Sequence, residues 1–444
     1  MGIHSTTSST DLQAREMQAD HPPLDERELD PSSDYLSSDD DEDDDDDSSS
    51  TASNSTVVFE HEPFSTFQHK ISVCAHQTLW PTADPASIVV TQMKGGGFNR
   101  IVGVSRITPK GRQVGKKFII RIPRFDDDAE NITADVAALQ LVRQCTSIPV
   151  PAVVRLTSGN DNAIGQPHTI QRFLKGEKAL SVYGDFSHQI RCQLATELGT
   201  AFRQILSTQT QIPGVPVFPP TDLTNAPLLQ TEVLVAPLPA GDPYQSLPYS
   251  ACQTGEPIPI LDFISSMFSH RKATSHTDTD DPAFEFGLYD QLFSLAKQLN
   301  AKGHFDNVPY TLVHTDLQSW NVMVNENPFP GDPVLSAIID WDGTVLAPAF
   351  MTCVPPQWLW SEEGVESEYE DESKAGDIPD DDPEQREIKL LFDEAAGPVY
   401  LRFAYDPVYR IARTILKYCF SPVCSDGDLC LIEEAVKLWE AIRE

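Results

Sequence analysis

The chain has 444 residues, 40% of them hydrophobic, and its formal net charge is −35. This length and apolar content are sufficient for a two-lobed core, whereas the acidic charge argues against nucleic acid as a partner. No apolar run reaches the roughly 18 residues of a membrane-spanning helix, and no signal peptide opens the chain, so we expect no stable membrane insertion.

The eight cysteines contain no C-x-x-C pair and no other familiar metal-binding spacing. Such cysteines are typical of reduced thiols in a protein of the cell interior. We therefore expect an intracellular, cytoplasmic protein.

Residues 1–56 form an acidic tail, in which 17 of the 19 charged residues are acidic. This segment cannot bury enough apolar surface to offset the entropy of ordering, so we expect it to be disordered. Ser37 and Ser38 directly precede an acidic run, a pattern that acidophilic kinases recognise. A solvating tail that is never modified is the alternative.

A glycine-rich hairpin is the first predicted element of the folded part. Gly95, Gly96 and Gly97 lie between two β-prone runs, 87–90 and 101–104. Glycines allow backbone N–H groups to approach phosphates closely, although many such turns only connect two strands.

An apolar strand over residues 117–124 follows, with Arg121 within it. The next segment, 133–143, has the apolar spacing of a helix, and Asp135 lies near its start. Residues 168–176 then read as a strand that leads into a connection between lobes.

The second half of the chain has the pattern of a mainly helical region. Residues 207–260 contain 11 prolines, which exclude long helices and predict an extended insertion. The acidic segment 361–387 is predicted to be a mobile insertion. Predicted helices cover residues 187–206, 286–302, 384–396, 399–418 and 426–443.

The most informative motif is the run from His314 to Asn321, which has the form H-x-D-x-x-x-x-N. In a loop of this kind the aspartate, here Asp316, accepts the proton of an attacking hydroxyl. The asparagine five residues later holds a phosphate-bound Mg²⁺.

A second carboxylate segment follows nineteen residues after Asn321. The run 336–339 is apolar and strand-like, and it ends in Asp340 and Asp342. Oxygen donors at the ends of strands suit Mg²⁺, so Asp340 is the expected second ligand and Asp342 is the substitute. The alternative is that both residues only form a turn.

Residues 313–316 and 339–341 resemble the signature segments of aminoglycoside phosphotransferase-like and choline kinase-like enzymes, in a fungal-type form. The resemblance covers most of residues 57–444. It implies an α+β, two-lobed protein-kinase-like fold with a β-rich N-lobe over 57–174 and a mainly helical C-lobe over 175–444. ATP and Mg²⁺ would bind between the lobes.

The resemblance also implies a role for each candidate residue. Asp316 would be the catalytic base, and Asn321 and Asp340 would hold Mg²⁺. His314 would brace the loop. The residues expected at the nucleotide are the hairpin glycines Gly95, Gly96 and Gly97, Arg121 in place of the usual strand lysine, Asp135 in place of the helix glutamate that pairs with this cation, and the backbone near Gln171 and Phe173.

The expected reaction is ATP- and Mg²⁺-dependent transfer of the γ-phosphoryl group to a hydroxyl of a small molecule. The acceptor and the oligomeric state stay open. One alternative is a nucleotide-binding pseudoenzyme, which Arg121 and Asp135 favour and the intact Asp316, Asn321 and Asp340 oppose. Another is an interaction protein that works through its acidic tail.

Overall fold

The computed structural model describes residues 61–219, 231–238, 257–274, 282–361 and 382–443, except positions 94, 96 and 424, together with a few single residues between 372 and 379. The predicted tail 1–56, its serines Ser37 and Ser38, and most of the acidic segment 361–387 lie outside these residues. None of the described helices is both long and apolar enough to cross a membrane.

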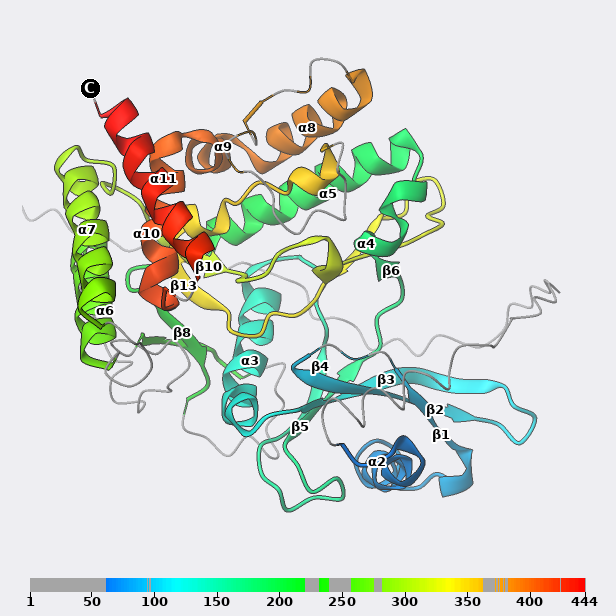
Figure 1. The fold of residues 1–444 in the computed structure, drawn as a ribbon. Helices are drawn as coiled ribbons and strands as arrows, with labels where there is room; N and C mark the ends of the chain where they lie inside the picture. Colours follow the sequence, from blue (N-terminus) through cyan, green and yellow to red (C-terminus); the bar gives the residue numbers. More distant parts are fainter. Residues whose placement is uncertain are drawn as a thin grey trace, which may run out of the picture. The chain divides into compact units, whose positions relative to one another are not determined.

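The N-terminal region is built on a five-stranded antiparallel sheet with the order β1-β2-β3-β5-β4 (Figure 1). A long helix, α3, connects β3 to β4. The elements are β1 Ile88–Gln92, β2 Asn99–Ile107, β3 Gln113–Pro123, α3 Asp126–Cys145, β4 Val153–Thr157 and β5 His168–Arg172.

One helix of this region was not predicted. Helix α2, Phe64–Leu79, packs on one face of the sheet through Phe67, Ile71 and Cys74, which join Val102 and Ile120 in a separate apolar core. The apolar residues of α2 recur every three or four positions, so the sequence does carry the helical signal.

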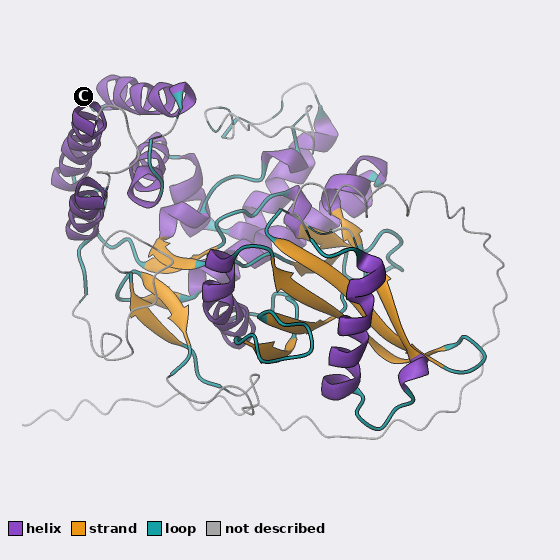
Figure 2. Ribbon diagram, turned by 60° about the horizontal axis from the view of Figure 1, so that its bottom comes forward, coloured by secondary structure: helices purple, strands orange, loops and turns teal. Residues whose placement is uncertain are grey.

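The C-terminal region is mainly helical, which confirms the expected α+β architecture (Figure 2). Its main core is one apolar cluster that spans most of these helices. The helices are α4 Ala179–Val182, α5 His188–Ser207, α6 Ile260–Thr274, α7 Pro282–Ala301, α8 Pro383–Ala396, α9 Pro398–Tyr405, α10 Pro407–Phe420 and α11 Asp426–Ile442.

The helix predicted over 399–418 is two helices, α9 and α10. The chain breaks at Asp406, because a residue before proline is disfavoured in the α conformation. Asp406 has an extended backbone and accepts the N–H of Val408 at 3.0 Å, which caps α10.

Two small sheets carry the loops of the candidate site. Tyr310–Val313 (β10) and Val345–Pro348 (β13) lie in the middle of the sheet β7-β10-β13-β8-β9. The other three strands, β7, β8 and β9, come from the proline-rich segment 207–260, so part of that segment belongs to this sheet. The remaining strands are β6 Glu177–Lys178, β7 Gln209–Thr210, β8 Gly214–Val217, β9 Leu234–Pro237, β11 Val322–Val324 and β12 Leu335–Ile338, and β12-β11-β6 form the second sheet.

Candidate active site

Strand pairing places the two predicted metal ligands beside each other. Strand β11 begins directly after Asn321, and β12 ends two residues before Asp340. The two strands pair antiparallel with Val322 opposite Ile338, so their outer ends meet. The N–H of Ile339 donates to the carbonyl of Asn321 at 2.9 Å, which continues this pairing into the site.

The carboxylate of Asp316 is held at one of its two oxygens. Asn321 Nδ2 donates to Oδ2 at 2.8 Å, and Trp320 Nε1 donates to the same oxygen at 2.9 Å. Asn321 Nδ2 also donates to the main-chain carbonyl of Asp316 at 2.7 Å. The other oxygen, Oδ1, accepts no hydrogen bond from the described residues, so it is available to a substrate hydroxyl.

His314 fixes the loop to the segment that follows β12. Its Nδ1 accepts the N–H of Asp316 at 3.1 Å, so Nε2 carries the hydrogen and donates to the carbonyl of Ile339 at 2.9 Å. Its ring packs on Trp341 with centroids 4.7 Å apart. Burial lowers the pKa of His314, and the neutral ring braces the loop as expected.

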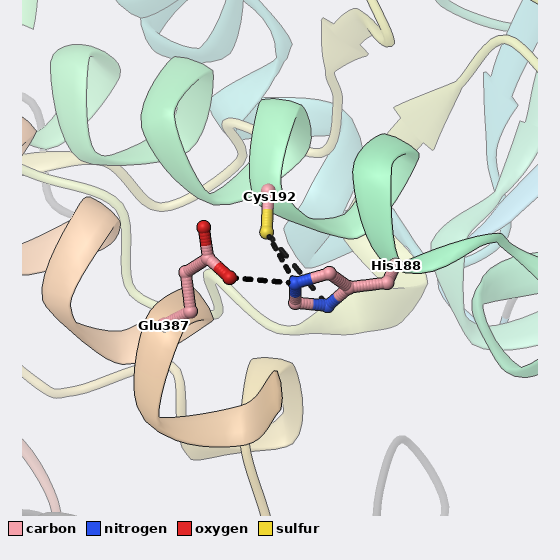
Figure 3. A group of neighbouring side chains, drawn as sticks. All are labelled: His188, Cys192 and Glu387. Carbon is pink, nitrogen blue, oxygen red and sulfur yellow. Dashed lines mark hydrogen bonds and ion pairs between the residues drawn. The ribbon is translucent and has the colours of Figure 1, made fainter. Parts of the chain in front are cut away.

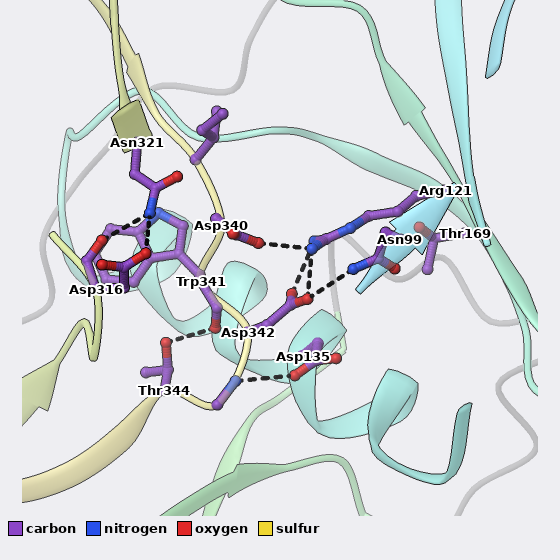
Figure 4. Close-up of polar contacts among 12 residues, drawn as sticks. Asn99, Arg121, Asp135, Thr169, Asp316, Asn321, Asp340, Trp341, Asp342 and Thr344 are labelled. Carbon is purple, nitrogen blue, oxygen red and sulfur yellow. Dashed lines mark hydrogen bonds and ion pairs between the residues drawn. The ribbon is translucent and has the colours of Figure 1, made fainter. Parts of the chain in front are cut away.

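Asp340 has an unusual backbone conformation, with a φ of +64°. Non-glycine residues in this region are uncommon, and such strain concentrates at functional sites. The turn directs both Asp340 and Asp342 toward β3, where they meet Arg121 (Figure 4).

Arg121 bridges the two carboxylates. Its Nη2 donates to Asp340 Oδ1 at 2.6 Å, and its Nη1 donates to Asp342 Oδ1 at 2.8 Å, with a further contact from Nη2 to Asp342 Oδ2. Burial by itself lowers the pKa of Arg121, but the nearby carboxylates of Asp342 and Asp340 reverse this and raise it. Burial raises the pKa of Asp342, and Arg121 opposes that rise.

Asp135, the expected partner of Arg121, forms a different contact. Its Oδ1 accepts the N–H of Gly343 at 3.3 Å, so α3 holds the turn that carries Asp340 and Asp342. Burial, followed by the charge of Asp342, raises the pKa of Asp135 well above its usual value. Asp135 therefore contacts the turn of Asp340 and Asp342 through the backbone N–H of Gly343.

The glycine-rich hairpin is described only in part, because Gly96 lies outside the described residues. A Cβ at Gly95 would lie 2.7 Å from the carbonyl oxygen of Asn99, whereas one at Gly97 would meet open space. Asn99 was not predicted as a site residue, yet its side-chain amide lies 3.4 Å from Asp342.

The predicted hinge residues are engaged with the sheet. Gln171 is buried, and its Nε2 donates to the hydroxyl of Thr169 at 3.1 Å. The N–H of Phe173 donates to the carbonyl of Lys117 at 3.2 Å. The backbone N–H of Phe173 is therefore already engaged with β3.

A cavity of about 880 Å³ opens beside Asp316 on the side of α10 and α11. Residues 314–318 form one wall, and apolar side chains of β13 and the two helices form much of the rest. Its charged lining residues besides Asp316 are Glu372, Arg410, Arg413, Lys417 and Glu434.

Three cations line this cavity, and they differ in what they contact. Arg413 is buried, pairs with Glu372 at 2.7 Å and donates to three main-chain carbonyls, so its role is structural. Lys417 pairs with Asp428 at 3.1 Å. Arg410 is half-buried, and its guanidinium has no hydrogen-bond or ion-pair partner among the described residues.

The model of the phosphotransferase enzyme family matches residues 104–387, which is more than half of the chain. A subtelomeric hrmA-associated cluster protein of Aspergillus fumigatus is 24% identical over 356 residues, which are 68% of this chain and 67% of that protein.

Among solved structures, the ADP-bound aminoglycoside phosphotransferase APH(2'')-Ib matches 84% of this chain and 97% of its own, with a TM-score of 0.44 and 12% identity. The GDP complex of wild-type aminoglycoside 2'-phosphotransferase-IIIa matches 84% of this chain and 97% of its own, with a TM-score of 0.43 and 14% identity. The family assignment rests on the family model and not on these scores.

Proposed function

Because the chain belongs to the phosphotransferase enzyme family, we propose that it is an ATP- and Mg²⁺-dependent kinase of a small-molecule hydroxyl. The observation that carries the proposal is the convergence of Asp316, Asn321 and Asp340 through the pairing of β11 with β12. Asp316, in the loop between β10 and β11, would supply the base, and Asn321 and Asp340, at the outer end of the β11–β12 hairpin, would supply metal ligands.

The residues present fit a magnesium ion. Asp340 and Asp342 present carboxylate oxygens at a position where a cation, the Arg121 guanidinium, already lies between them. Asn321 uses its nitrogen on Asp316, which leaves its side-chain oxygen for a metal. All three donors are oxygens, as Mg²⁺ requires, and a bound ion would neutralise charge on the phosphates.

In the proposed reaction, Asp316 Oδ1 accepts the proton of the acceptor hydroxyl. The hydroxyl oxygen forms a bond to the γ-phosphorus of ATP, and the bond between that phosphorus and the leaving ADP oxygen breaks. Trp320 and Asn321 hold the other carboxylate oxygen, so the base keeps its orientation. Arg121 would exchange a carboxylate for a phosphate oxygen when nucleotide binds.

The acceptor would occupy the cavity beside Asp316. Apart from Asp316 itself, Arg410 and the exposed Glu434 are the lining charges without an ion-pair partner among the described residues, and Arg410, the more buried of the two, would bind an anionic group of the acceptor. Arg413 and Glu372 compensate each other, and Lys417 already has a partner in Asp428. Arg410 is the half-buried cation without a partner in the described part of the chain. A carboxylate or phosphate on a hydroxylated molecule would supply that partner.

A metabolite-extract screen for ATP-dependent phosphorylation tests the proposal. The full chain is incubated with ATP, Mg²⁺ and extract fractions from ion-exchange columns, and ADP is measured against an Asp316→Asn control. We expect ADP formation with a fraction that anion-exchange resin retains. A chain that binds MgATP but never exceeds the control with any fraction is not a kinase of such molecules.

The second candidate is a protein that binds nucleotide without turnover. The pairing of Arg121 with Asp340 and Asp342, instead of with Asp135, favours it. The same experiment separates the two functions, because only the kinase forms ADP in excess of the Asp316→Asn control.

A further inference from the structure

A cluster of nitrogen, sulfur and oxygen donors lies between α5 and α8, outside the candidate active site (Figure 3). His188 and Cys192 stand one helical turn apart on α5, and Glu387 faces them from α8. The three donor atoms all lie within 4.8 Å of one another. Two helices thus direct three different kinds of metal donor toward one point.

The two donor separations measured from His188 are close to those around a tetrahedral ion. His188 Nε2 lies 3.4 Å from Cys192 Sγ and 2.9 Å from Glu387 Oε2. Tetrahedral zinc with normal bond lengths places its nitrogen, sulfur and oxygen donors about 3.4 to 3.6 Å apart. The cysteine distance already fits, and the glutamate would move outward by a few tenths of an ångström when its hydrogen bond to the ring is replaced.

A second carboxylate is placed to orient the histidine. Glu384, one turn before Glu387 on α8, has Oε2 3.7 Å from His188 Nδ1. Histidine ligands commonly donate their other ring N–H to a carboxylate, which fixes the ring and strengthens the metal bond. Glu384 lies beside Nδ1, the ring nitrogen that would not bind the ion.

The cluster is also accessible. The side chain of His188 is 28% exposed and that of Glu387 is 61% exposed, so an ion and its remaining water ligand can reach the site from solvent. A hydrogen bond between His188 and Glu387 with a nearby thiol would explain the contacts without a metal, and it is the alternative to be tested.

We propose that His188, Cys192 and Glu387 bind a zinc-class transition-metal ion that ties α5 to α8. Binding replaces the thiol proton of Cys192 with the metal and releases that proton to solvent. Hard ions such as Mg²⁺ are excluded by the sulfur and nitrogen donors. The sequence could not indicate this site by spacing alone, because Glu387 stands 195 positions after Cys192 and the donors meet only when α5 packs on α8.

Titration of the full chain with Co²⁺, with the near-ultraviolet thiolate-to-cobalt charge-transfer band as the signal, tests the proposal. We expect a band that saturates at one equivalent and is displaced by Zn²⁺. It should be lost in Cys192→Ser and weakened at least tenfold in affinity in His188→Gln. Cys430→Ser, which removes an exposed cysteine of α11, and Asp340→Asn, which alters the proposed magnesium site, should both keep the band.

The melting temperature gives a second, independent signal. Zn²⁺ should raise it in the wild-type chain and in Cys430→Ser, but not in Cys192→Ser. A band of equal strength in wild type and Cys192→Ser, or no band in a folded wild-type chain, would overturn the metal site. Neither result depends on phosphotransfer.

Discussion

The nucleotide end and the acceptor end of the candidate site differ in how their charges are compensated. At the nucleotide end, Arg121 bridges Asp340 and Asp342, so cation and carboxylates neutralise each other. At the acceptor end, Arg410 has no partner among the described residues. In the proposed reaction the first end would exchange partners when nucleotide binds, whereas the second has a cation without a described partner, to which an anion could bind directly.

The largest expected effect comes from Asp316, which lies between the two ends. Asp316→Asn should lower kcat by about 100- to 10,000-fold, because an amide cannot accept the hydroxyl proton. Binding of MgATP, measured by calorimetry, should stay unchanged. An Asp316→Asn chain that turns over at the wild-type rate would remove this residue from the chemistry.

Changes at the proposed metal ligands should weaken the binding of magnesium-bound nucleotide specifically. Asn321→Ala or Asp340→Ala should weaken binding of MgATP far more than binding of metal-free ATP, by about tenfold or more. Folding should survive in both variants, because the Asp340 side chain is 43% exposed and the two hydrogen bonds of the buried Asn321 contribute only about 1 kcal/mol each. Equal losses in the two titrations would contradict the assignment of the ligands.

Variants of Arg121 test whether its guanidinium leaves Asp340 and Asp342 for a phosphate when ATP binds. Arg121→Ala should raise the KM for ATP about 10- to 100-fold, and Arg121→Lys should retain part of the function because it keeps the charge and loses the planar fork. If Arg121→Ala leaves the KM for ATP at its wild-type value, the guanidinium only neutralises Asp340 and Asp342.

Arg410 tests the acceptor end separately. Arg410→Gln should raise the KM for the acceptor fraction about tenfold or more without changing the KM for ATP, and Arg410→Lys should be intermediate. Arg112→Gln, at an exposed turn before β3, is the matched control. An acceptor that anion-exchange resin does not retain, with Arg410→Gln as active as wild type, would exclude an anionic acceptor.

The smallest expected effect concerns His314, whose ring holds the loop of Asp316 to the segment after β12. The pKa of His314 is lowered in the folded chain by burial, so the unfolded chain binds the proton more readily. Its neutral form therefore stabilises the fold above the unfolded pKa, and this contribution is lost as the pH falls below about 6.5. In thermal unfolding from pH 7.5 to 5, His314→Asn should lose less stability than wild type. Equal losses would show that His314 does not sense this change.

The sequence by itself determined the candidate catalytic loop of this protein. The spacing of His314, Asp316 and Asn321 is local, and the loop between β10 and β11 brings these residues together. The helices α5, α8 and α11 were also predicted to within about two residues, because their apolar periodicity and capping are local signals.

Only the tertiary structure decided what these residues contact. Arg121 and Asp342 are 221 positions apart, and no local pattern selects Asp342 over Asp135 as the partner of Arg121. Asp135 instead accepts the N–H of Gly343, in the turn that follows β12, 208 positions away. The acceptor cavity likewise exists only where β10 and β13 meet α10 and α11. Partners and cavities depend on packing between distant segments, and spacing along the chain carries no record of that packing.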